Sequence, residues 1–362
     1  MKYRLYYLDD DPNAQALADG FNSQGVIEVQ VFRATSFSNQ IIELKENEKS
    51  FQGLILDLKL DDNRKGERVA DYTATSLAQN IRSKVIEGYW EKEFPIFLFT
   101  TYTNYTKLFL IDISGQDLFD KVFMKEDIGN IRIQNKIADI IRAYQIISEN
   151  RSDYYHILNI KDISRLDQRI FPGPLVESSP VFNHAIYILN ELVLRPGPLI
   201  DEFYLASRLG IDIEKSADWK FIKDEVLNES MYFGVFSNAW KRWWMFKIND
   251  WWKEIGNEQM LAGLDARERV GIINGKFGLN LVAADPIKKS ASYRYWTICQ
   301  ALKRPLDPRE GLRIFEKDPY PWQETRYISI EAALERIRFD EGIRVHPAER
   351  DRFNDLKEIF SK

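Results

Sequence analysis

Short apolar runs alternate with amphipathic segments through residues 1–147. Strands are predicted where apolar residues run continuously or alternate with polar ones, over 3–8, 26–32, 53–60, 94–101 and 121–125. Helices are predicted between them, where apolar residues recur at helical spacing, over 13–25, 36–47, 71–87 and 131–147. Strands that alternate with helices pair in parallel, with helices on both faces. The pattern therefore predicts an α/β fold with a doubly wound, parallel, five-stranded sheet.

The pattern changes after residue 147. Residues 148–180 are polar and contain prolines and a glycine, which indicates a connector. Helical spacing returns over 181–194 and 199–211, which are separated by the breaker RPGP. We therefore expect three parts, namely an α/β domain over 1–147, a connector over 148–180 and a mainly α-helical domain over 181–362.

The composition fits a globular protein of two or three domains, because the chain has 362 residues, of which 44% are hydrophobic and 29% charged. A net charge of −5 gives no reason to expect nucleic acid as the main partner. The single cysteine, Cys299, excludes an internal disulfide and a thiolate metal cluster. The sequence has no signal-peptide core, and no apolar run approaches the roughly 20 residues of a membrane helix. We therefore expect a cytoplasmic protein without a membrane partner.

Polar side chains end four of the predicted strands. Asp9 and Asp10 follow the first strand, and Asp57 lies near the end of the third. Thr100 lies at the end of the fourth strand and Lys125 at the end of the fifth. In open α/β sheets the ligand site lies beyond the carboxyl ends of the strands. These side chains are therefore expected to meet in one crevice.

Three carboxylates in one crevice repel each other unless a cation joins them. Mg²⁺ prefers oxygen ligands, so Asp10 and Asp57 can bind it directly, and Asp9 directly or through water. Asp57 is then a candidate nucleophile toward phosphorus, forming an aspartyl phosphate. Mg²⁺ and Lys125 can stabilise the phosphoryl oxygens, and the Thr100 hydroxyl can bond one of them. A simpler interpretation, in which the first aspartates make a turn or cap a helix, stays open.

Four stretches resemble the motifs of the receiver domain of two-component response regulators. They are YYLDDDP, LILDLKL, FLFTT and FMK, in that order within residues 1 to about 147. The resemblance implies a flavodoxin-like fold with strand order 2-1-3-4-5. It also implies a histidine kinase as phosphoryl donor, and a receiver that catalyses its own phosphorylation and hydrolyses its acyl phosphate. We recognise no separate catalytic domain.

The resemblance also assigns a role to each site residue. It implies Asp9 and Asp10 as metal-binding acids, Asp57 as phosphoacceptor and metal ligand, the Lys59 backbone carbonyl as a further Mg²⁺ ligand, Thr100 as the switch hydroxyl and Lys125 as the phosphate-pairing amine.

This sequence departs from the family pattern around the switch. Glu126 follows Lys125 where the family usually has proline, and Val122 stands where the aromatic switch residue is expected, with Phe123 as its neighbour. Leu60 replaces the usual proline after the phosphoacceptor. The residues therefore support phosphoacceptor chemistry more firmly than the usual coupling from threonine to an aromatic side chain.

Two stretches stand out in the C-terminal part. Tryptophans at helical spacing are expected on one helical face, where they pack in the core or form a partner surface: Trp240, Trp243, Trp244 and Trp251. The stretch YLASRLGID resembles the first half of a helix-turn-helix. The following segment carries four acids against three lysines, which is unfavourable for a helix that faces DNA phosphates.

The domain arrangement, with LASRLGID and KRWW, resembles the receiver-plus-uncharacterised-domain regulators of Detocs-type bacterial defence systems. That resemblance implies a regulator or phosphate buffer in an antiviral phosphorelay.

We therefore expect a response regulator that accepts a phosphoryl group on Asp57 with Mg²⁺ and acts on a downstream protein. An effector enzyme with its catalytic site in 181–362, and a DNA-binding regulator using 199–225, stay open. The oligomeric state is also open, a homodimer included.

Overall fold

The computed structural model describes residues 2–23, 25–60, 70, 72–106, 117–127, 129–151, 153–171, 178–256 and 258–360. The chain divides into two compact units. Unit 1 comprises Met1–Ile163, Phe171–Leu189 and Phe233–Trp240, and unit 2 comprises Ser164–Ile170, Asn190–Tyr232 and Lys241–Lys362. Unit 1 thus extends beyond the predicted boundary at 147 and includes two later segments of the sequence.

Unit 1 contains the predicted five-stranded sheet. Its strands are β1 (Tyr3–Asp9), β2 (Ile27–Arg33), β3 (Gly53–Asp57), β4 (Ile96–Thr100) and β5 (Lys121–Met124). They are all parallel and lie in the order β2-β1-β3-β4-β5, which confirms the predicted flavodoxin-like topology. The three inner strands, β1, β3 and β4, are short and largely buried, as expected for a sheet covered on both faces.

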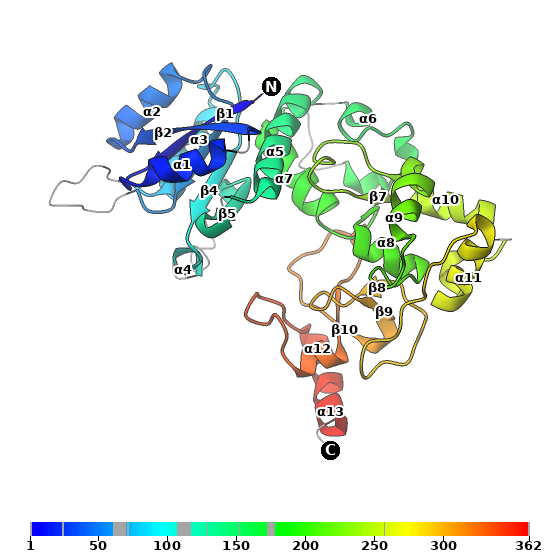
Figure 1. Ribbon diagram of the computed structural model, residues 1–362. Coiled ribbons are helices and arrows are strands. Elements are labelled where there is room, and N and C mark those ends of the chain that lie inside the picture. The colour runs from blue at the N-terminus through cyan, green and yellow to red at the C-terminus, as the bar shows by residue number, and fades with distance from the viewer. Residues whose placement is uncertain are drawn as a thin grey trace. The chain divides into compact units, whose positions relative to one another are not determined.

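Helices lie on both sides of this sheet (Figure 1). The helices of unit 1 are α1 (Ala14–Asn22), α2 (Phe37–Glu46), α3 (Ala74–Ile86), the short α4 (Tyr102–Asn104), α5 (Ile131–Glu149), α6 (Tyr154–Ile157) and α7 (Val181–Tyr187). Side chains of α2 and α3 pack with Leu54, Leu56 and Leu98 on one face. On the other face the ring of Phe21, from α1, lies 5.0 Å from that of Phe99.

The core of unit 1 includes residues beyond the predicted end of the α/β domain. Helix α7 packs along α5. The Phe182 backbone N–H donates to Glu93 at 3.3 Å, and the Phe182 ring lies 4.5 Å from the Arg82 guanidinium carbon. Arg151 forms an ion pair with the same Glu93 at 2.9 Å. Part of the expected connector therefore belongs to the first compact unit.

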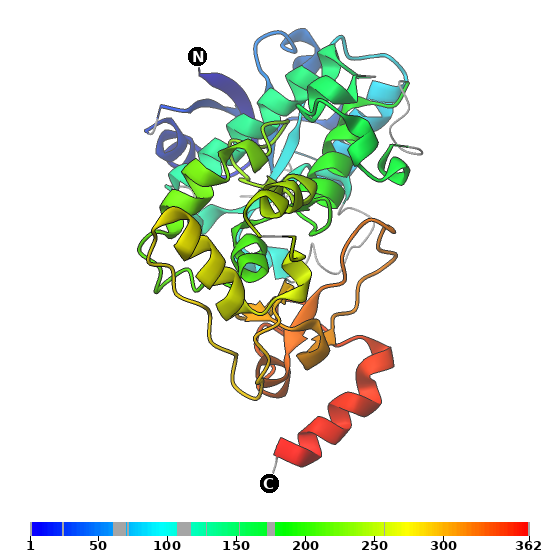
Figure 2. The same cartoon turned by 90° about the vertical axis from the view of Figure 1, so that its right-hand side faces the viewer.

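Unit 2 is helical, as predicted for the C-terminal part, and it also contains small two-stranded sheets, which the sequence analysis did not predict. Its helices are α8 (Glu202–Leu209), α9 (Trp219–Phe221), α10 (Met245–Ile255), α11 (Ala266–Phe277), α12 (Ile330–Leu334) and α13 (Arg350–Phe360). Its antiparallel strand pairs are β6 (Leu199–Ile200) with β7 (Trp243–Trp244), β8 (Thr297–Ile298) with β9 (Pro305–Leu306), and β10 (Gly311–Arg313) with β11 (Tyr327–Ser329). Figure 2 shows α13 projecting beyond β10 and β11, the strands before it.

The prediction that four tryptophans share one helical face is wrong. Trp243 and Trp244 form strand β7 and are 0% and 1% exposed, and Trp240 precedes that strand and is 8% exposed. Trp251 alone of the four lies in a helix, α10, where its ring stacks on Phe277 at 6.3 Å. Because Trp243 and Trp244 are buried, they form core and not a partner surface.

The segment that resembles a helix-turn-helix begins with a buried helix. Six of the eight residues of α8 are buried, and the predicted first turn of this helix is strand β6 instead. Gly210 ends α8 with φ +77°, and a Cβ there would lie 2.5 Å from Cα of Ala266. The glycine is therefore required for the close approach of α11.

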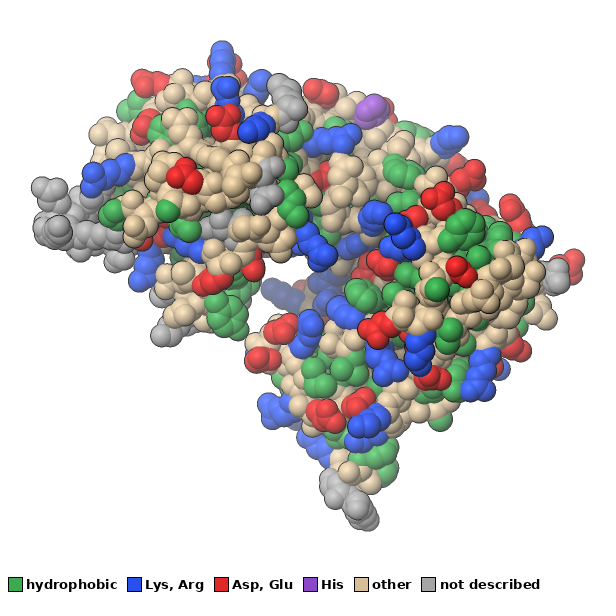
Figure 3. Space-filling view, in the orientation of Figure 1, with side chains coloured by type: hydrophobic (Ala, Val, Ile, Leu, Met, Phe, Trp, Pro, Cys, Tyr) green, Lys and Arg blue, Asp and Glu red, His purple; other side chains and the backbone are tan. Residues whose placement is uncertain are grey.

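On the face shown in Figure 3, basic and acidic side chains are interspersed.

None of the helices in the described ranges is long and apolar enough to cross a membrane.

Candidate functional site

The end of β1 presents Asp9, which is 3% exposed. The backbone N–H of Asp11 donates to Asp9 Oδ1 at 2.8 Å, and the Tyr7 hydroxyl donates to Asp9 Oδ2. Successive strand residues point to opposite faces, so Tyr7 and Asp9, two apart, share a face. These hydrogen bonds therefore hold the Asp9 carboxylate in position without a ligand.

The end of β3 presents Asp57, which is 8% exposed. Strand β3 lies between β1 and β4, with Leu56 beside Leu8 and Asp57 beside Phe99. The backbone N–H of Lys59 donates to Asp57 Oδ2 at 2.9 Å. The other oxygen, Oδ1, is thus directed away from that turn and is available to a second group.

Lys125 contacts the acidic side chains at the ends of both β1 and β3. Its Nζ lies 2.5 Å from Asp57 Oδ1 and 3.0 Å from Asp9 Oδ2. The lysine follows β5, and two strands separate β5 from β1 in the sheet. The structure therefore brings Asp9, Asp57 and Lys125 into the single crevice that the sequence predicted.

The same crevice fits a divalent cation. Carboxylate oxygens of Asp9, Asp10 and Asp57 lie within 4.8 Å of one another. Among the residues that the structure describes, this is the one such group of acids, histidines or cysteines. Hard oxygen donors without sulfur or imidazole suit Mg²⁺. The expected fourth contribution, from the Lys59 carbonyl, stays a prediction.

Burial and charge shape the acidity of the site. Burial raises the pKa of Asp57 to about 6, with Lys125 acting in the opposite direction and Asp9 adding to the rise. Burial alone would lower the pKa of Lys125, but the Asp57 and Asp9 carboxylates outweigh it and raise that pKa above its usual value. Lys125 is therefore a permanent cation, which suits it to pair with phosphoryl oxygens.

Thr100 lies where the sequence predicted, at the end of β4 beside β3. It is 1% exposed, and its hydroxyl lies 3.5 Å from the Thr101 carbonyl oxygen. The structure shows no hydrogen bond between Thr100 and Asp57 among the described residues, so the role of Thr100 as a switch hydroxyl stays a prediction.

The aromatic residue next to the expected switch position points away from it. Phe123 is buried and its ring lies 6.0 Å from Phe97 and 5.9 Å from Phe99. Val122 packs on the opposite face of the sheet, against the core of α2 and α3. Because neighbouring strand residues alternate between faces, Phe123 cannot take the place of an aromatic residue at 122.

Glu126 makes a contact that the sequence did not predict. Its Oε1 accepts a hydrogen bond from the Tyr102 backbone N–H at 3.3 Å. Tyr102 begins α4, directly after Thr101, and its side chain is 60% exposed. The residue in the usual proline position therefore ties the loop after β5 to the loop after β4.

Tyr7 is the site residue that the sequence analysis missed. Its hydroxyl contacts Asp9, and burial followed by the charge of Asp9 raises the pKa of Tyr7 well above its usual range. The hydroxyl therefore stays protonated and donates. The spacing in the sequence could have indicated it, because a tyrosine two residues before an acid at the end of a strand lies on the same face of the sheet as that acid.

We expect Tyr7→Phe to lower the free energy of unfolding by about 1–3 kcal/mol, because the buried Asp9 carboxylate would lose a hydrogen-bond donor. Urea denaturation of the full chain measures the change. Tyr3→Phe is the matched control on the same strand, because its hydroxyl has no hydrogen bond within the described part of the chain. Equal effects of the two substitutions would remove the assigned role of Tyr7.

Comparison with known proteins gives fold-level likenesses. The sequence matches no model of a known protein family and no curated protein. Among solved structures, NtrX from Brucella abortus is 13% identical with a TM-score of 0.30, and the match covers 47% of this chain and 34% of NtrX. FixJ from B. japonicum is 12% identical with a TM-score of 0.31, over 47% of this chain and 71% of FixJ. This chain thus spans about a third of NtrX.

A third likeness is to the signal receiver domain of a putative LuxO repressor protein from Vibrio parahaemolyticus. It is 13% identical with a TM-score of 0.29, over 41% of this chain and 97% of that domain. At these TM-scores the likenesses support no conclusion about activity. The function is therefore inferred from the residues of this chain.

Proposed function

We propose that this protein is a two-component regulator that accepts a phosphoryl group on Asp57. The observation that supports this most directly is the contact of one lysine, Lys125, with both Asp57 and Asp9 at the carboxyl edge of a parallel sheet. The parallel strand order β2-β1-β3-β4-β5 supports the proposal, because doubly wound folds bind ligands at the carboxyl edge of the sheet. A histidine kinase is the proposed phosphoryl donor.

The residues have distinct tasks in the proposed reaction. An oxygen of Asp57 attacks the phosphorus of a phosphohistidine, the new O–P bond forms and the P–N bond breaks, and the bonding electron pair leaves with the imidazole. Lys125 pairs with a phosphoryl oxygen during the transfer. Asp9 and Asp10, with Asp57, would hold Mg²⁺, which supplies further charge neutralisation when bound.

The direct test is phosphorylation of the full chain by acetyl phosphate in the presence of Mg²⁺. We expect an acyl phosphate that hydroxylamine removes, and peptide mapping after borohydride reduction should place it at Asp57. Chelation of Mg²⁺ with EDTA should suppress labelling. Absence of label, or a label on another residue, would contradict the proposal.

We expect Lys125→Ala to slow phosphoryl transfer by about 10²–10³-fold, the usual effect of removing one group that stabilises developing charge. Initial rates of labelling from acetyl phosphate measure the loss. Lys92→Ala, an exposed lysine in unit 1, is the control and should keep the wild-type rate. An unchanged rate in Lys125→Ala, with wild-type far-UV circular dichroism, would exclude a catalytic role for this lysine.

The proposed output is contact with a downstream protein. Phosphorylation adds negative charge at the crevice and would shift an equilibrium between two conformations. Because Phe123 and Val122 cannot provide the usual aromatic switch, the hydrogen bond between Glu126 and the Tyr102 N–H is the proposed link from the crevice to exposed Tyr102. A role in an antiviral phosphorelay is a finer proposal, which loss of phage protection in cells expressing Asp57→Asn would support.

A further inference from the structure

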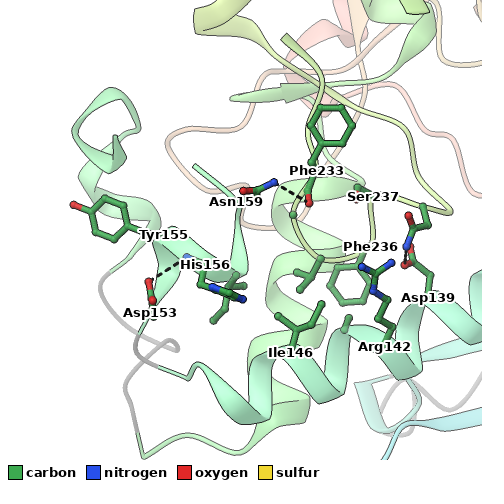
Figure 4. Close-up of a pocket in the computed structure, with 15 residues that line it drawn as sticks. Asp139, Arg142, Ile146, Asp153, Tyr155, His156, Asn159, Phe233, Phe236 and Ser237 are labelled. Atoms are coloured by element: carbon green, nitrogen blue, oxygen red, sulfur yellow. Dashed lines mark hydrogen bonds between the residues drawn. The ribbon is translucent and has the colours of Figure 1, made fainter. Parts of the chain in front are cut away.

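A cavity of about 570 Å³ lies in unit 1, between α5, α6 and the segment 233–238 (Figure 4). Small-molecule sites commonly measure about 300–1,000 Å³. Its lining contains none of the five side chains of the acidic crevice, which are Asp9, Asp10, Asp57, Thr100 and Lys125. The cavity is therefore a separate place in the same compact unit.

Hydrogen bonds fix the wall that faces α5. Asp139, on α5, accepts from the Asn238 side chain and from the Ala239 backbone N–H, both at 2.9 Å. The backbone N–H of Val235 donates to the Ile157 carbonyl at 3.0 Å. These bonds hold the segment against both helices, so the cavity is formed without a ligand.

The segment also contains a strained backbone position. Phe236 has φ +69°, a left-handed conformation that is unfavourable for a bulky side chain. Its ring is 1% exposed and lies 6.2 Å from that of Trp240. The surrounding contacts therefore impose this conformation, and the buried ring forms part of the wall of the cavity while it offers almost no surface to a ligand.

Some polar side chains of the cavity already form hydrogen bonds within the protein, and others do not. Both carboxylate oxygens of Asp139 already accept hydrogen bonds, and Asp153 accepts one from the His156 backbone N–H at 3.1 Å. The Arg142 guanidinium and the His156 imidazole have no hydrogen bond or ion pair within the described ranges. Arg142 is exposed, and its charge interacts with that of the nearby Asp139, but its guanidinium N–H groups form no hydrogen bond there and can donate to a ligand.

Figure 4 shows Arg142 beside Phe236 on one side of the cavity, His156 on the other, and Ile146 between them. A planar guanidinium binds carboxylate or phosphate through two parallel hydrogen bonds. The half-buried Ile146 next to it offers apolar surface that suits a hydrocarbon ring or chain. A ligand that satisfies both features combines an anionic group with an apolar body.

We propose that this cavity binds a small organic anion. Its carboxylate or phosphate group pairs with Arg142, its apolar body lies on Ile146, and its far end reaches toward His156. A smaller cavity of about 390 Å³ shares Arg142, Asp139 and Asn238, so the arginine can be approached from either side. The inference does not depend on phosphorylation of Asp57.

Benzoate and phenyl phosphate are the probes for this site, observed with the full chain by saturation-transfer difference NMR and titration. Both should bind saturably, and Arg142→Ala should weaken binding by about tenfold or more, as expected for a lost hydrogen bond to a charged group. Ile146→Glu places a carboxylate on the half-buried floor and should abolish binding of both probes. The controls are Arg132→Ala, which removes an arginine that is also exposed and on the same helix but does not line the cavity, and benzylamine, a cation of similar size.

Each outcome bears on the proposal. Loss of binding in Arg142→Ala and Ile146→Glu, with binding kept in Arg132→Ala, supports it. No saturable binding to the wild type, or equal affinity in Arg142→Ala, overturns it. Inorganic phosphate binding as tightly as phenyl phosphate, or benzylamine binding as tightly as benzoate, also overturns it, because the apolar floor or the arginine would then contribute nothing. Wild-type melting temperatures for the variants confirm that they are folded.

Discussion

Asp57→Asn is expected to reduce phosphoryl incorporation from acetyl phosphate to background. The amide has nearly the shape of the carboxylate and can still accept the Lys59 N–H, but it carries no charge and is a poor nucleophile toward phosphorus. The substitution also removes one of three crowded acids, so it relieves repulsion with Asp9. The variant should therefore be inactive as an acceptor while it unfolds at the same or a higher urea concentration than the wild type.

The control for this experiment is Asp19→Asn, an exposed aspartate on α1. It should label at the wild-type rate, measured by intact mass of the full chain over time. A label retained on Asp57→Asn, removable by hydroxylamine, would move the acceptor to another acid, with Asp9 and Asp10 the nearest. A variant that fails to label and also unfolds early would show that Asp57 has a structural role that its contacts do not reveal.

The sheet could be predicted because each of its strands carries its own signal. A parallel strand covered on both faces is a short run of apolar residues, as in GLILD and IFLFT. Such runs are too short for helices, and the longer amphipathic segments between them have helical spacing. The site followed from topology, since parallel strands present their carboxyl ends at one edge. The polar residue at each strand end was therefore sufficient to predict the meeting of Asp9, Asp57 and Lys125.

The tryptophan-rich stretch was mispredicted because spacing alone does not distinguish its structures. Trp240, Trp243 and Trp244 fit helical positions i, i+3 and i+4, but two adjacent buried tryptophans also suit a short strand that is covered on both faces. The pairing of Trp244 with Leu199 and of Trp243 with Ile200 decides between them. That pairing joins residues more than forty positions apart, which no local pattern reveals.

The extent of unit 1 also could not be predicted from local sequence patterns. On α5 the positions three or four residues from Asp139 include Asn135, Lys136 and Arg142, so local spacing does not distinguish it from a solvated acid. Its partners, Asn238 and Ala239, are about a hundred residues later in the chain. Burial raises the pKa of Asp139, with the Ala239 N–H acting in the opposite direction, which marks it as part of the packed interior. Such contacts depend on tertiary structure.

A second buried network stabilises unit 1 away from the acidic crevice. Asp120, just before β5, is 5% exposed and accepts hydrogen bonds from three parts of the unit. The donors are Arg82 of α3 at 2.7 Å, the Ile96 backbone N–H of β4 at 2.8 Å and the Tyr144 hydroxyl of α5 at 2.6 Å. One carboxylate therefore joins a helix on each face of the sheet to the sheet itself.

Asp120→Ala is expected to lower the free energy of unfolding by about 3–5 kcal/mol, because it leaves Arg82, 3% exposed, as a buried charge without its partner. Urea denaturation measures the total loss, and hydrogen exchange of the β4 and β5 peptides should locate it in unit 1. Asp117→Ala, an exposed acid three residues earlier, should change stability by less than about 0.5 kcal/mol. Equal stabilities of the two variants would mean that water replaces the carboxylate. Within the described ranges Asp120 has no hydrogen bond or ion pair with a residue of the crevice. The folded fraction of Asp120→Ala should therefore still label at Asp57, the reverse of the behaviour expected for Asp57→Asn.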